Sequence, residues 1–201
     1  GFAGALYPVN PRRTEVCGVK AYVSIDDLPG PVDFALVAAP VEQSIEIVRA
    51  AVRKGIKFIH FFTSGFGETG NLKLEKDLVR EARKGHLRIV GPNCIGVQCF
   101  ESKLSFRLTQ AQEQPGTIAF LGQSGGITSS FVAMATTRGI WLNKVVSYGN
   151  QIDLRLEDYL AYLADDDKIR LVACYVEDIK DTDKFLKTLR KATAKKPVII
   201  L

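Results

Sequence analysis

The segment 91–96, Gly-Pro-Asn-Cys-Ile-Gly, is the most informative group of residues in this sequence whose types could do chemistry. It follows the apolar run 87–90, and its proline and glycines predict a stiff turn directly after a strand. The turn presents Asn93 and Cys94 as compact polar side chains. Ligands of parallel α/β sheets bind beyond the carboxyl ends of the strands, so we expect a ligand here. A tight turn without a ligand would have the same sequence.

Three more groups are expected at the same edge of the same sheet. They are residues 10–13 (Asn-Pro-Arg-Arg), Pro40 and the glycine-rich segment 63–70 (Thr-Ser-Gly-Phe-Gly-Glu-Thr-Gly). A phosphate-bearing ligand needs positive charge and donors without bulk. Arg12 and Arg13 supply the charge, and the glycines let the backbone approach closely. Alternatively, the two arginines belong to a solvated turn.

Residues 123–128, Gln-Ser-Gly-Gly-Ile-Thr, lie between a predicted strand and a predicted helix. The start of a helix has free backbone N–H groups and about half a positive charge, so it binds anions. Ser124 adds a hydroxyl donor there, or acts only as the N-cap of the helix. The segment is not a Walker motif, because no lysine follows the glycines, and it lacks the G-x-G-x-x-G spacing.

Three titratable side chains near strands have both a chemical and a structural interpretation. Glu177 follows the apolar run 171–176, where a carboxylate can orient a histidine, hold a cation or simply be solvated. Cys94 has no histidine near it in sequence, so a structural role fits it better than that of a nucleophile. His60 lies in the apolar run 58–62 and is expected to be a core histidine rather than a general base.

Strands and helices alternate along the chain, which predicts parallel sheets with right-handed crossovers. The expected strands are residues 5–7, 32–39, 56–62, 87–90, 117–121, 144–147, 169–176 and 198–201. The expected helices, from their apolar spacing, are residues 43–54, 72–83, 127–137, 156–163 and 183–192. Residues 97–114 show no firm period, and a Gln-Pro-Gly turn follows. We therefore expect one domain over residues 1–113 and a second over residues 114–201.

Composition narrows the class of protein. The 201 residues are 46% hydrophobic and 24% charged, as in ordinary globular proteins. The net charge of +5 is dispersed along the chain, so a nucleotide or coenzyme A fits it better than nucleic acid. No apolar run is long enough to span a membrane, and no signal peptide is evident. Four cysteines without a C-x-x-C pair predict no metal site and a reducing cytoplasm.

The order of these motifs resembles that of the NDP-forming acyl-CoA synthetases, relatives of the succinyl-CoA synthetase α subunit. The resemblance covers essentially the whole chain. It rests on residues 7–11 (Tyr-Pro-Val-Asn-Pro), 39–40 (Ala-Pro), 63–68, 91–96, 123–126, 147–150 (Ser-Tyr-Gly-Asn) and 175–177 (Tyr-Val-Glu). It implies an α/β fold with two tandem parallel-sheet, three-layer domains. The first is a Rossmann-like CoA-binding domain, and the second is a flavodoxin-like domain of the succinyl-CoA synthetase type.

The resemblance also implies roles for individual residues. Coenzyme A is expected to contact Asn10, Pro11, Arg12, Arg13, Pro40, Thr63, Ser64, Asn93 and Cys94. Ser124, Gly125 and Gly126 are expected to hold a phosphate that a phosphorylated histidine carries, and Glu177 to orient that histidine. No metal ligand is expected in this chain.

The expected partners follow from the same resemblance. The reaction converts acyl-CoA, NDP and phosphate into a carboxylate, NTP and CoA, so the substrates are CoA and a small carboxylic acid. An ATP-grasp subunit or fused domain outside this chain would hold Mg²⁺ with ADP or ATP. The protein is expected to be a cytoplasmic oligomer that binds neither nucleic acid nor membrane.

Two elements of the family are missing from the sequence. The first glycine-rich CoA loop is expected before Gly1, and the phosphorylated histidine is expected after Leu201, because neither His60 nor His86 matches it. We therefore expect a part of a longer polypeptide. A non-catalytic CoA- or acyl-CoA-binding module of a larger enzyme, such as a protein acetyltransferase, stays open as an alternative. An NAD-dependent oxidoreductase is disfavoured because no G-x-G-x-x-G follows a strand.

Overall fold

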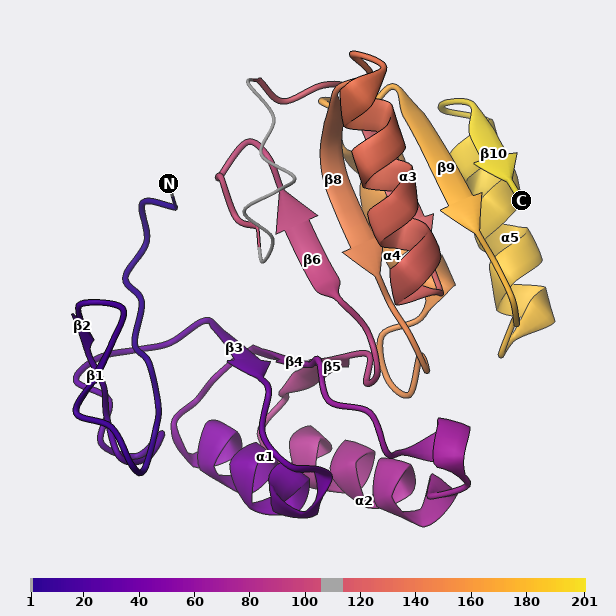
Figure 1. The fold of residues 1–201 in the computed structure, drawn as a ribbon. Coiled ribbons are helices and arrows are strands. Elements are labelled where there is room, and N and C mark those ends of the chain that lie inside the picture. The colour runs from indigo at the N-terminus through magenta and orange to yellow at the C-terminus, as the bar shows by residue number, and fades with distance from the viewer. Residues whose placement is uncertain (1, 106–113) are drawn as a thin grey trace.

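A computed structural model describes residues 2–105 and 114–201, which form two α/β parts (Figure 1). The strands of the first part are β3 (Phe34–Val37), β4 (Phe58–Phe61) and β5 (Arg88–Val90). Its helices are η1 (Val41–Gln43), α1 (Ser44–Arg53), η2 (Gly67–Thr69) and α2 (Leu72–Arg83). The three strands are parallel and lie in the order β3-β4-β5.

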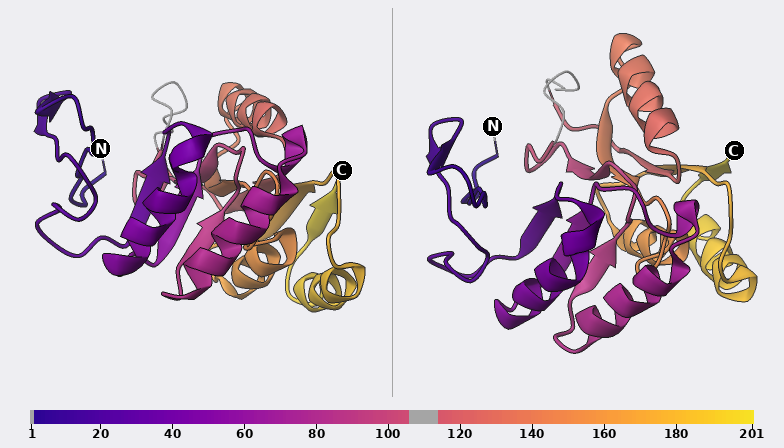
Figure 2. Two further views of the ribbon diagram at one scale, coloured as in Figure 1. Left: turned by 90° about the horizontal axis from the view of Figure 1, so that it is seen from below. Right: turned by 60° about the horizontal axis from the view of Figure 1, so that its bottom comes forward.

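The side chains of β4 alternate between the two faces of the first sheet, and this alternation shows which face the helices cover. Ile59 and Phe61 are buried in a cluster with Val48 of α1 and Leu78 of α2. Both helices therefore lie on one face of the sheet, as the view from below shows (Figure 2). His60 points to the opposite face, because successive side chains of a strand alternate between faces.

The second part holds a five-stranded sheet in the order β10-β9-β7-β8-β6. Its strands are β6 (Gly96–Cys99), β7 (Ile118–Gly122), β8 (Leu142–Ser147), β9 (Leu171–Tyr175) and β10 (Val198–Ile200). Its helices are α3 (Gly125–Thr137), α4 (Leu156–Asp165) and α5 (Thr182–Thr193). All neighbouring strands are parallel except β6, which pairs antiparallel with β8.

Helices cover both faces of the second sheet, so this part has three layers. Phe120 of β7 packs in one cluster with Val132 of α3. The neighbouring Leu121 packs in another cluster with Leu160 of α4 and Phe185 of α5. The α/β architecture that the alternation predicted is confirmed, and most predicted helices and strands agree with the observed bounds to within two residues.

Strand β6 was missed from the sequence. Its residues pair with β8, for example Gln98 with Val145, so the second sheet recruits residues that precede the predicted boundary after residue 113. The segment 106–113, which adjoins that boundary, lies outside the described residues. The alternation rule could not find β6, because an antiparallel edge strand requires no crossover helix.

The predicted strand over residues 5–7 is wrong. No strand among the described residues pairs with it, and the chain instead forms an isolated bridge between Val9 and Tyr22. A short hairpin follows, made of β1 (Glu15–Val16) and β2 (Val19–Lys20). Cys17 and Gly18, which join the two strands, have φ of 49° and 78°. Positive φ at both positions is typical of a tight hairpin turn, but cysteine there gives no sequence signal.

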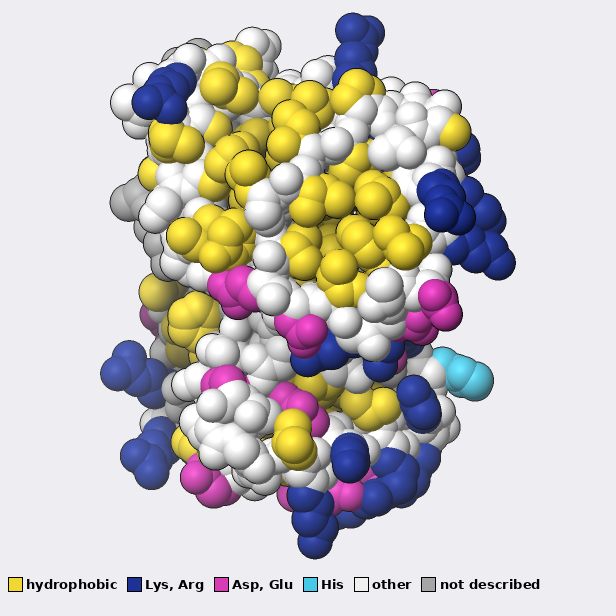
Figure 3. Space-filling view, turned by 90° about the vertical axis from the view of Figure 1, so that its right-hand side faces the viewer, with side chains coloured by type: hydrophobic (Ala, Val, Ile, Leu, Met, Phe, Trp, Pro, Cys, Tyr) yellow, Lys and Arg dark blue, Asp and Glu magenta, His cyan; other side chains and the backbone are white. Residues whose placement is uncertain are grey.

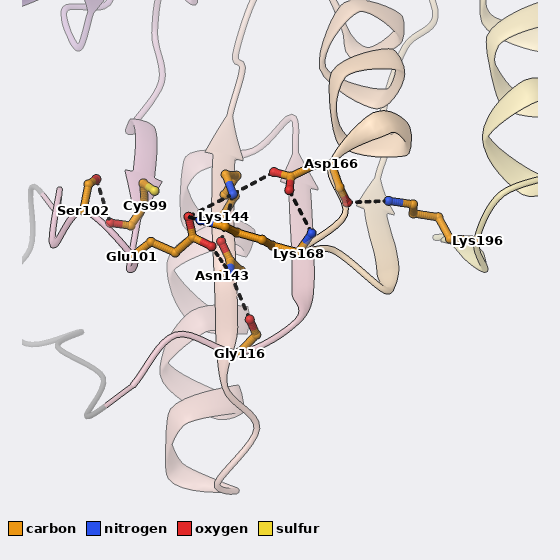
Figure 4. A network of polar contacts seen from close by, with 9 residues as sticks. All are labelled: Cys99, Glu101, Ser102, Gly116, Asn143, Lys144, Asp166, Lys168 and Lys196. Carbon is orange, nitrogen blue, oxygen red and sulfur yellow. Dashed lines mark hydrogen bonds and ion pairs between the residues drawn. The ribbon is translucent and has the colours of Figure 1, made fainter.

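A polar network fixes β8 against the segment after β6 and the end of α4 (Figure 4). The Lys144 ammonium lies 2.8 Å from Asp166 and 3.6 Å from Glu101, and the Asn143 amide donates to Glu101 at 2.9 Å. The hydrogen bond from Asn143, together with Lys168 and Lys144, holds the pKa of Glu101 below its usual value. The network thus ties the segment that follows β6 to β8 and to the end of α4.

The surface over the second part is strongly apolar on the side of β10 (Figure 3). Ile199 and Ile200 of this edge strand are exposed, as are Leu201 and, on α3, Ile127 and Met134. The lower half of the same view is rich in charged side chains. None of the helices in the described parts of the chain has the length and apolar character that crossing a bilayer requires.

Candidate functional site

The carboxyl ends of strands from both sheets meet at one cavity of about 680 Å³. The first part contributes Phe62, Gly67, Glu68, Leu72, Glu75, Asn93, Cys94 and Ile95. The second part contributes Gln123, Ser124, Gly125, Gly126, Gly149, Asn150, Glu177 and Lys180. The cavity therefore brings together Asn93, Cys94, Ser124, Gly125, Gly126 and Glu177, which the sequence placed in two separate domains.

A continuous joint between the two parts holds the walls of the cavity in place. The backbone of residues 150–154 runs beside residues 89–92, with Asn150 donating to Pro92 O at 3.0 Å and Ile152 donating to Gly91 O at 3.2 Å. The Asp153 carboxylate accepts from Arg88 Nε at 2.8 Å and from Ile89 N at 2.9 Å. These bonds place the turn after β5 directly beside the loop after β8.

The turn over residues 91–96 depends on special backbone conformations. Gly91 and Gly96 have φ of 91° and 82°, and Asn93 has φ of 55°. Asparagine tolerates this left-handed region better than most residues, which explains its presence at the tip. His60 supports the turn from below, because its Nε2 lies 2.9 Å from Cys94 O. A carbonyl only accepts, so Nε2 carries the proton, and burial lowers the pKa of the ring.

Cys94 lines the cavity but cannot serve as a nucleophile at neutral pH. Its side chain is buried, and burial raises the pKa of the thiol to about 12. Thiolate forms only near and above that pKa, so at pH 8 Cys94 stays a thiol. The structure thus fits a packing role for this residue beside any ligand.

Alkylation tests this environment of Cys94. With iodoacetamide at pH 8, the native protein is expected to label the exposed Cys17 quickly, while Cys94 and Cys174, whose pKa values are both raised by burial to about 12, stay unlabelled. Mass spectrometry of peptides after a short exposure to iodoacetamide gives the order in which the cysteines are labelled. Labelling of Cys94 as fast as Cys17 would show an activated thiol instead.

The start of α3 forms one corner of the cavity, called the α3 corner below. Ser124 is the N-cap, and its hydroxyl oxygen accepts from Ile127 N at 3.3 Å. The backbone N–H groups of Gly125 and Gly126 have no acceptor within the helix, as at any helix start, and both residues line the cavity. The corner thus combines free donors with the positive end of a helix, which suits an anion. The N-cap and anion interpretations of Ser124 are compatible.

Glu177 faces the same corner from the end of β9. Its side chain is exposed and lines the cavity, while its backbone N–H donates to Gln123 Oε1 at 2.9 Å. Asp178 N donates to the same oxygen at 2.9 Å. Gln123 therefore links the start of α3 to the loop that carries Glu177.

Two glutamates of the first part contact Asn150 of the second part at the rim of the cavity. Asn150 Nδ2 donates to Glu68 Oε2 at 2.5 Å and to Glu75 Oε1 at 2.8 Å. Partial burial alone would raise the pKa of Glu68, but hydrogen bonds from Asn150, Gly65 and Phe66 outweigh it and lower the pKa. The sequence identified Asn150 only as part of the motif over residues 147–150 and gave no sign of its contact with Glu68.

The remaining predicted residues do not line this cavity. They are Asn10, Pro11, Arg12, Arg13, Pro40, Thr63 and Ser64. Thr63 lies next to it, since its hydroxyl donates to Ala39 O at 2.7 Å and its carbonyl accepts from Asn93 N at 3.0 Å. Arg12 and Arg13 are exposed in a turn, and within residues 2–11 of the described chain no strand leads into it, so the expectation that they lie at the end of strand 5–7 is wrong.

Comparisons with known proteins match both parts of the chain. A model described as a CoA binding domain matches residues 3–99, and one described as a succinyl-CoA ligase like flavodoxin domain matches residues 115–201. The α subunit of acetate–CoA ligase [ADP-forming] II from Pyrococcus furiosus is 39% identical over 200 residues, covering 98% of this chain and 44% of that protein. The chain belongs to the NDP-forming acyl-CoA synthetase family.

Solved structures of this family agree with the fold. The dinucleotide forming acetyl-coenzyme A synthetase 1 of Ca. Korarchaeum cryptofilum, in complex with phosphate and ADP, is 30% identical. It superimposes with a TM-score of 0.95 over 100% of this chain and 44% of that one. The chain thus spans less than half the length of the curated synthetases and solved structures named here.

The described residues of this synthetase-family chain were also compared with the donor sets that metal ions require. Within residues 2–105 and 114–201, no group of three or more His, Cys, Asp or Glu side chains could hold a metal ion. The side chains that line the cavity instead suit an anion at the α3 corner and a ligand with apolar and amide groups near Phe62 and Asn93.

Proposed function

We propose that this chain is the CoA- and phosphate-binding part of an ADP-forming acyl-CoA ligase. In this proposal residues 1–113 bind coenzyme A and residues 114–201 bind phosphate. The reaction interconverts acyl-CoA, ADP and phosphate with a carboxylate, ATP and CoA. The observation that carries the proposal is the single cavity that Asn93 and Ser124 both line, because the thioester and the phosphate must meet to react.

Coenzyme A is proposed to lie along the carboxyl edge of the first sheet. Its pantetheine end would enter the cavity beside Asn93 and Cys94, passing Pro40, Thr63 and Ser64 at the ends of β3 and β4. The half-buried Asn10 and the exposed residues Pro11, Arg12 and Arg13 would contact the phosphates at the far end of the coenzyme. Arginine pairs well with phosphate oxygens, which is the physical reason for this assignment.

The chemistry is proposed to begin at the α3 corner. Phosphate held by Ser124, Gly125 and Gly126 attacks the thioester carbonyl, a C–O bond forms, the C–S bond breaks, and CoA leaves as the thiolate. The free N–H groups at the start of α3 hold the phosphate, and a preorganised positive dipole requires no rearrangement as charge moves. The resulting acyl phosphate gives its phosphoryl group to a histidine, releasing the carboxylate, and the histidine passes the group to ADP.

Glu177 is proposed to orient that histidine, which lies outside this sequence in our assignment. Mg²⁺ and the nucleotide would be held by an ATP-grasp subunit or domain, consistent with relatives that include a separate α subunit and single longer chains. The solved relative with phosphate and ADP supports a nucleotide-using reaction. We further propose that the complete enzyme is a cytoplasmic oligomer.

A coupled assay of the complete enzyme, with its nucleotide-binding part, tests this function. ATP formation from acetyl-CoA is expected to require ADP and phosphate together, and to release CoA in equal amount, measured by thiol titration. Acid-labile radioactivity on a histidine is expected after brief incubation with labelled ATP. Tight CoA binding by calorimetry without ATP formation for any of acetyl-, 4-hydroxybutyryl- and feruloyl-CoA would instead support a non-catalytic CoA-binding module.

A further inference from the structure

Gln123 lines the cavity and has no role in the proposed function, yet its backbone and its side chain both make polar contacts there. Its backbone N–H donates to Tyr175 O at 3.1 Å, and its carbonyl accepts from Gly149 N at 3.2 Å. Its side-chain Oε1 accepts from the N–H groups of both Glu177 and Asp178 at 2.9 Å. The residue thus joins β7 to the loops after β8 and β9, which all border the cavity.

The orientation of the Gln123 amide follows from these partners. Both groups that face it are backbone N–H donors, so the facing atom must be the oxygen, and the NH₂ group must point elsewhere. Among the described residues, no acceptor for that NH₂ group is recorded, and the residue lines the cavity next to Ser124. Two N–H donors are therefore available beside the α3 corner.

From this geometry we propose that Gln123 is a further phosphate-binding and positioning residue of the transfer site. Its carboxamide oxygen fixes the backbone that carries Glu177, and its NH₂ group donates to the phosphate held at the start of α3. The proposal rests on the proposed function for the identity of the ligand. One amide thereby sets the distance between the bound phosphate and Glu177, because both are attached to the same planar group.

Two substitutions separate the two roles of the Gln123 amide. Gln123→Glu keeps an oxygen for the Glu177 and Asp178 N–H groups but replaces the donor with a negative charge. Gln123→Met has similar length and makes neither contact. Gln114→Glu, at an exposed position outside the cavity, is the control for the charge change alone.

Steady-state kinetics of the complete enzyme with its nucleotide-binding part, and calorimetry with inorganic phosphate, give the readout. For Gln123→Glu we expect an unchanged Tm, an unchanged KM for ADP, and a KM and Kd for phosphate raised at least about tenfold. The phosphate defect should shrink as pH falls toward the pKa of the new carboxyl group, which a merely structural role would not produce. Gln123→Met should lower both Tm and kcat. Gln114→Glu should change neither the KM nor the Kd for phosphate.

The outcomes distinguish this inference from the proposed function. If the wild-type enzyme binds phosphate and Gln123→Glu binds it with the same Kd, the proposed role of Gln123 is wrong, while the ligase proposal is unaffected. Equal changes in the KM values for ADP and phosphate would overturn it as well. If the wild-type enzyme binds phosphate but forms no ATP, the ligase proposal fails, and the phosphate affinity of Gln123→Glu still decides the role of this residue.

Discussion

Replacement of Glu177 by glutamine is expected to lower kcat of the complete enzyme by about 100- to 1000-fold, with a Tm close to that of the wild type. The side chain is exposed at the cavity, and among the described residues its carboxylate makes no recorded ion pair or hydrogen bond, so the fold does not depend on it. The loss would come from a misplaced phosphoryl-carrying histidine. Rapid-quench measurement of histidine phosphorylation from labelled ATP locates the step.

The neighbouring Asp178 supplies a matched control for this substitution. It lies on the same loop and is exposed, but it pairs with Lys180 at 2.5 Å and does not line the cavity. Asp178→Asn is expected to keep kcat within about threefold of the wild type, as for an exposed ion pair. A Glu177→Gln enzyme with the same small effect would remove Glu177 from the transfer step.

Replacement of Gly149 by alanine is expected to lower the free energy of unfolding by about 3 kcal/mol and to weaken CoA and phosphate binding together. A Cβ at this position would lie 2.2 Å from Pro92 O and 2.7 Å from Asn93 O. The φ of 53° adds strain for any residue other than glycine. Because backbone atoms on both sides of the joint must move, the two walls of the cavity would separate. Calorimetric unfolding and ligand titrations of the complete protein measure both effects.

Substitution of Gly139 measures the strain of a positive φ alone, without the steric clash expected at Gly149. It has a φ of 69°, but no atom lies within 4 Å of the position that a Cβ would take. Gly139→Ala is therefore expected to cost about 1 kcal/mol and to leave both ligand affinities unchanged. If Gly149→Ala behaves in the same way as Gly139→Ala, the two parts are not joined as described.

The sequence predicted the second part of the fold well because its strands and helices alternate with clear apolar spacing. Helix α5, with Phe185 and Ala192 buried, and strand β9 were placed to within two residues. The prediction from sequence failed where the pairing of a strand depends on residues far away in the chain. Strand β6 is recognisable only once Gln98 is known to lie opposite Val145, and the hairpin at Cys17 has no turn signature.

The candidate site was partly predictable for a related reason. The residues at strand ends, such as Asn93 and Ser124, share a position that the parallel-sheet rule identifies without coordinates. The residues that hold them in place do not share such a position. Gln123, Asn150 and Glu68 act through contacts between segments 54 and 82 residues apart, and polar residues in loops are too common in sequences to reveal such pairing.

A crystal structure of the complete enzyme with CoA and inorganic phosphate tests most directly whether both sheets serve one reaction. We expect the pantetheine sulfur beside Asn93 and the phosphate on the N–H groups of Gly125 and Gly126, in the same cavity and close enough to react across a bound acyl group. CoA bound with its thiol outside that cavity, or phosphate bound away from the start of α3, would contradict it.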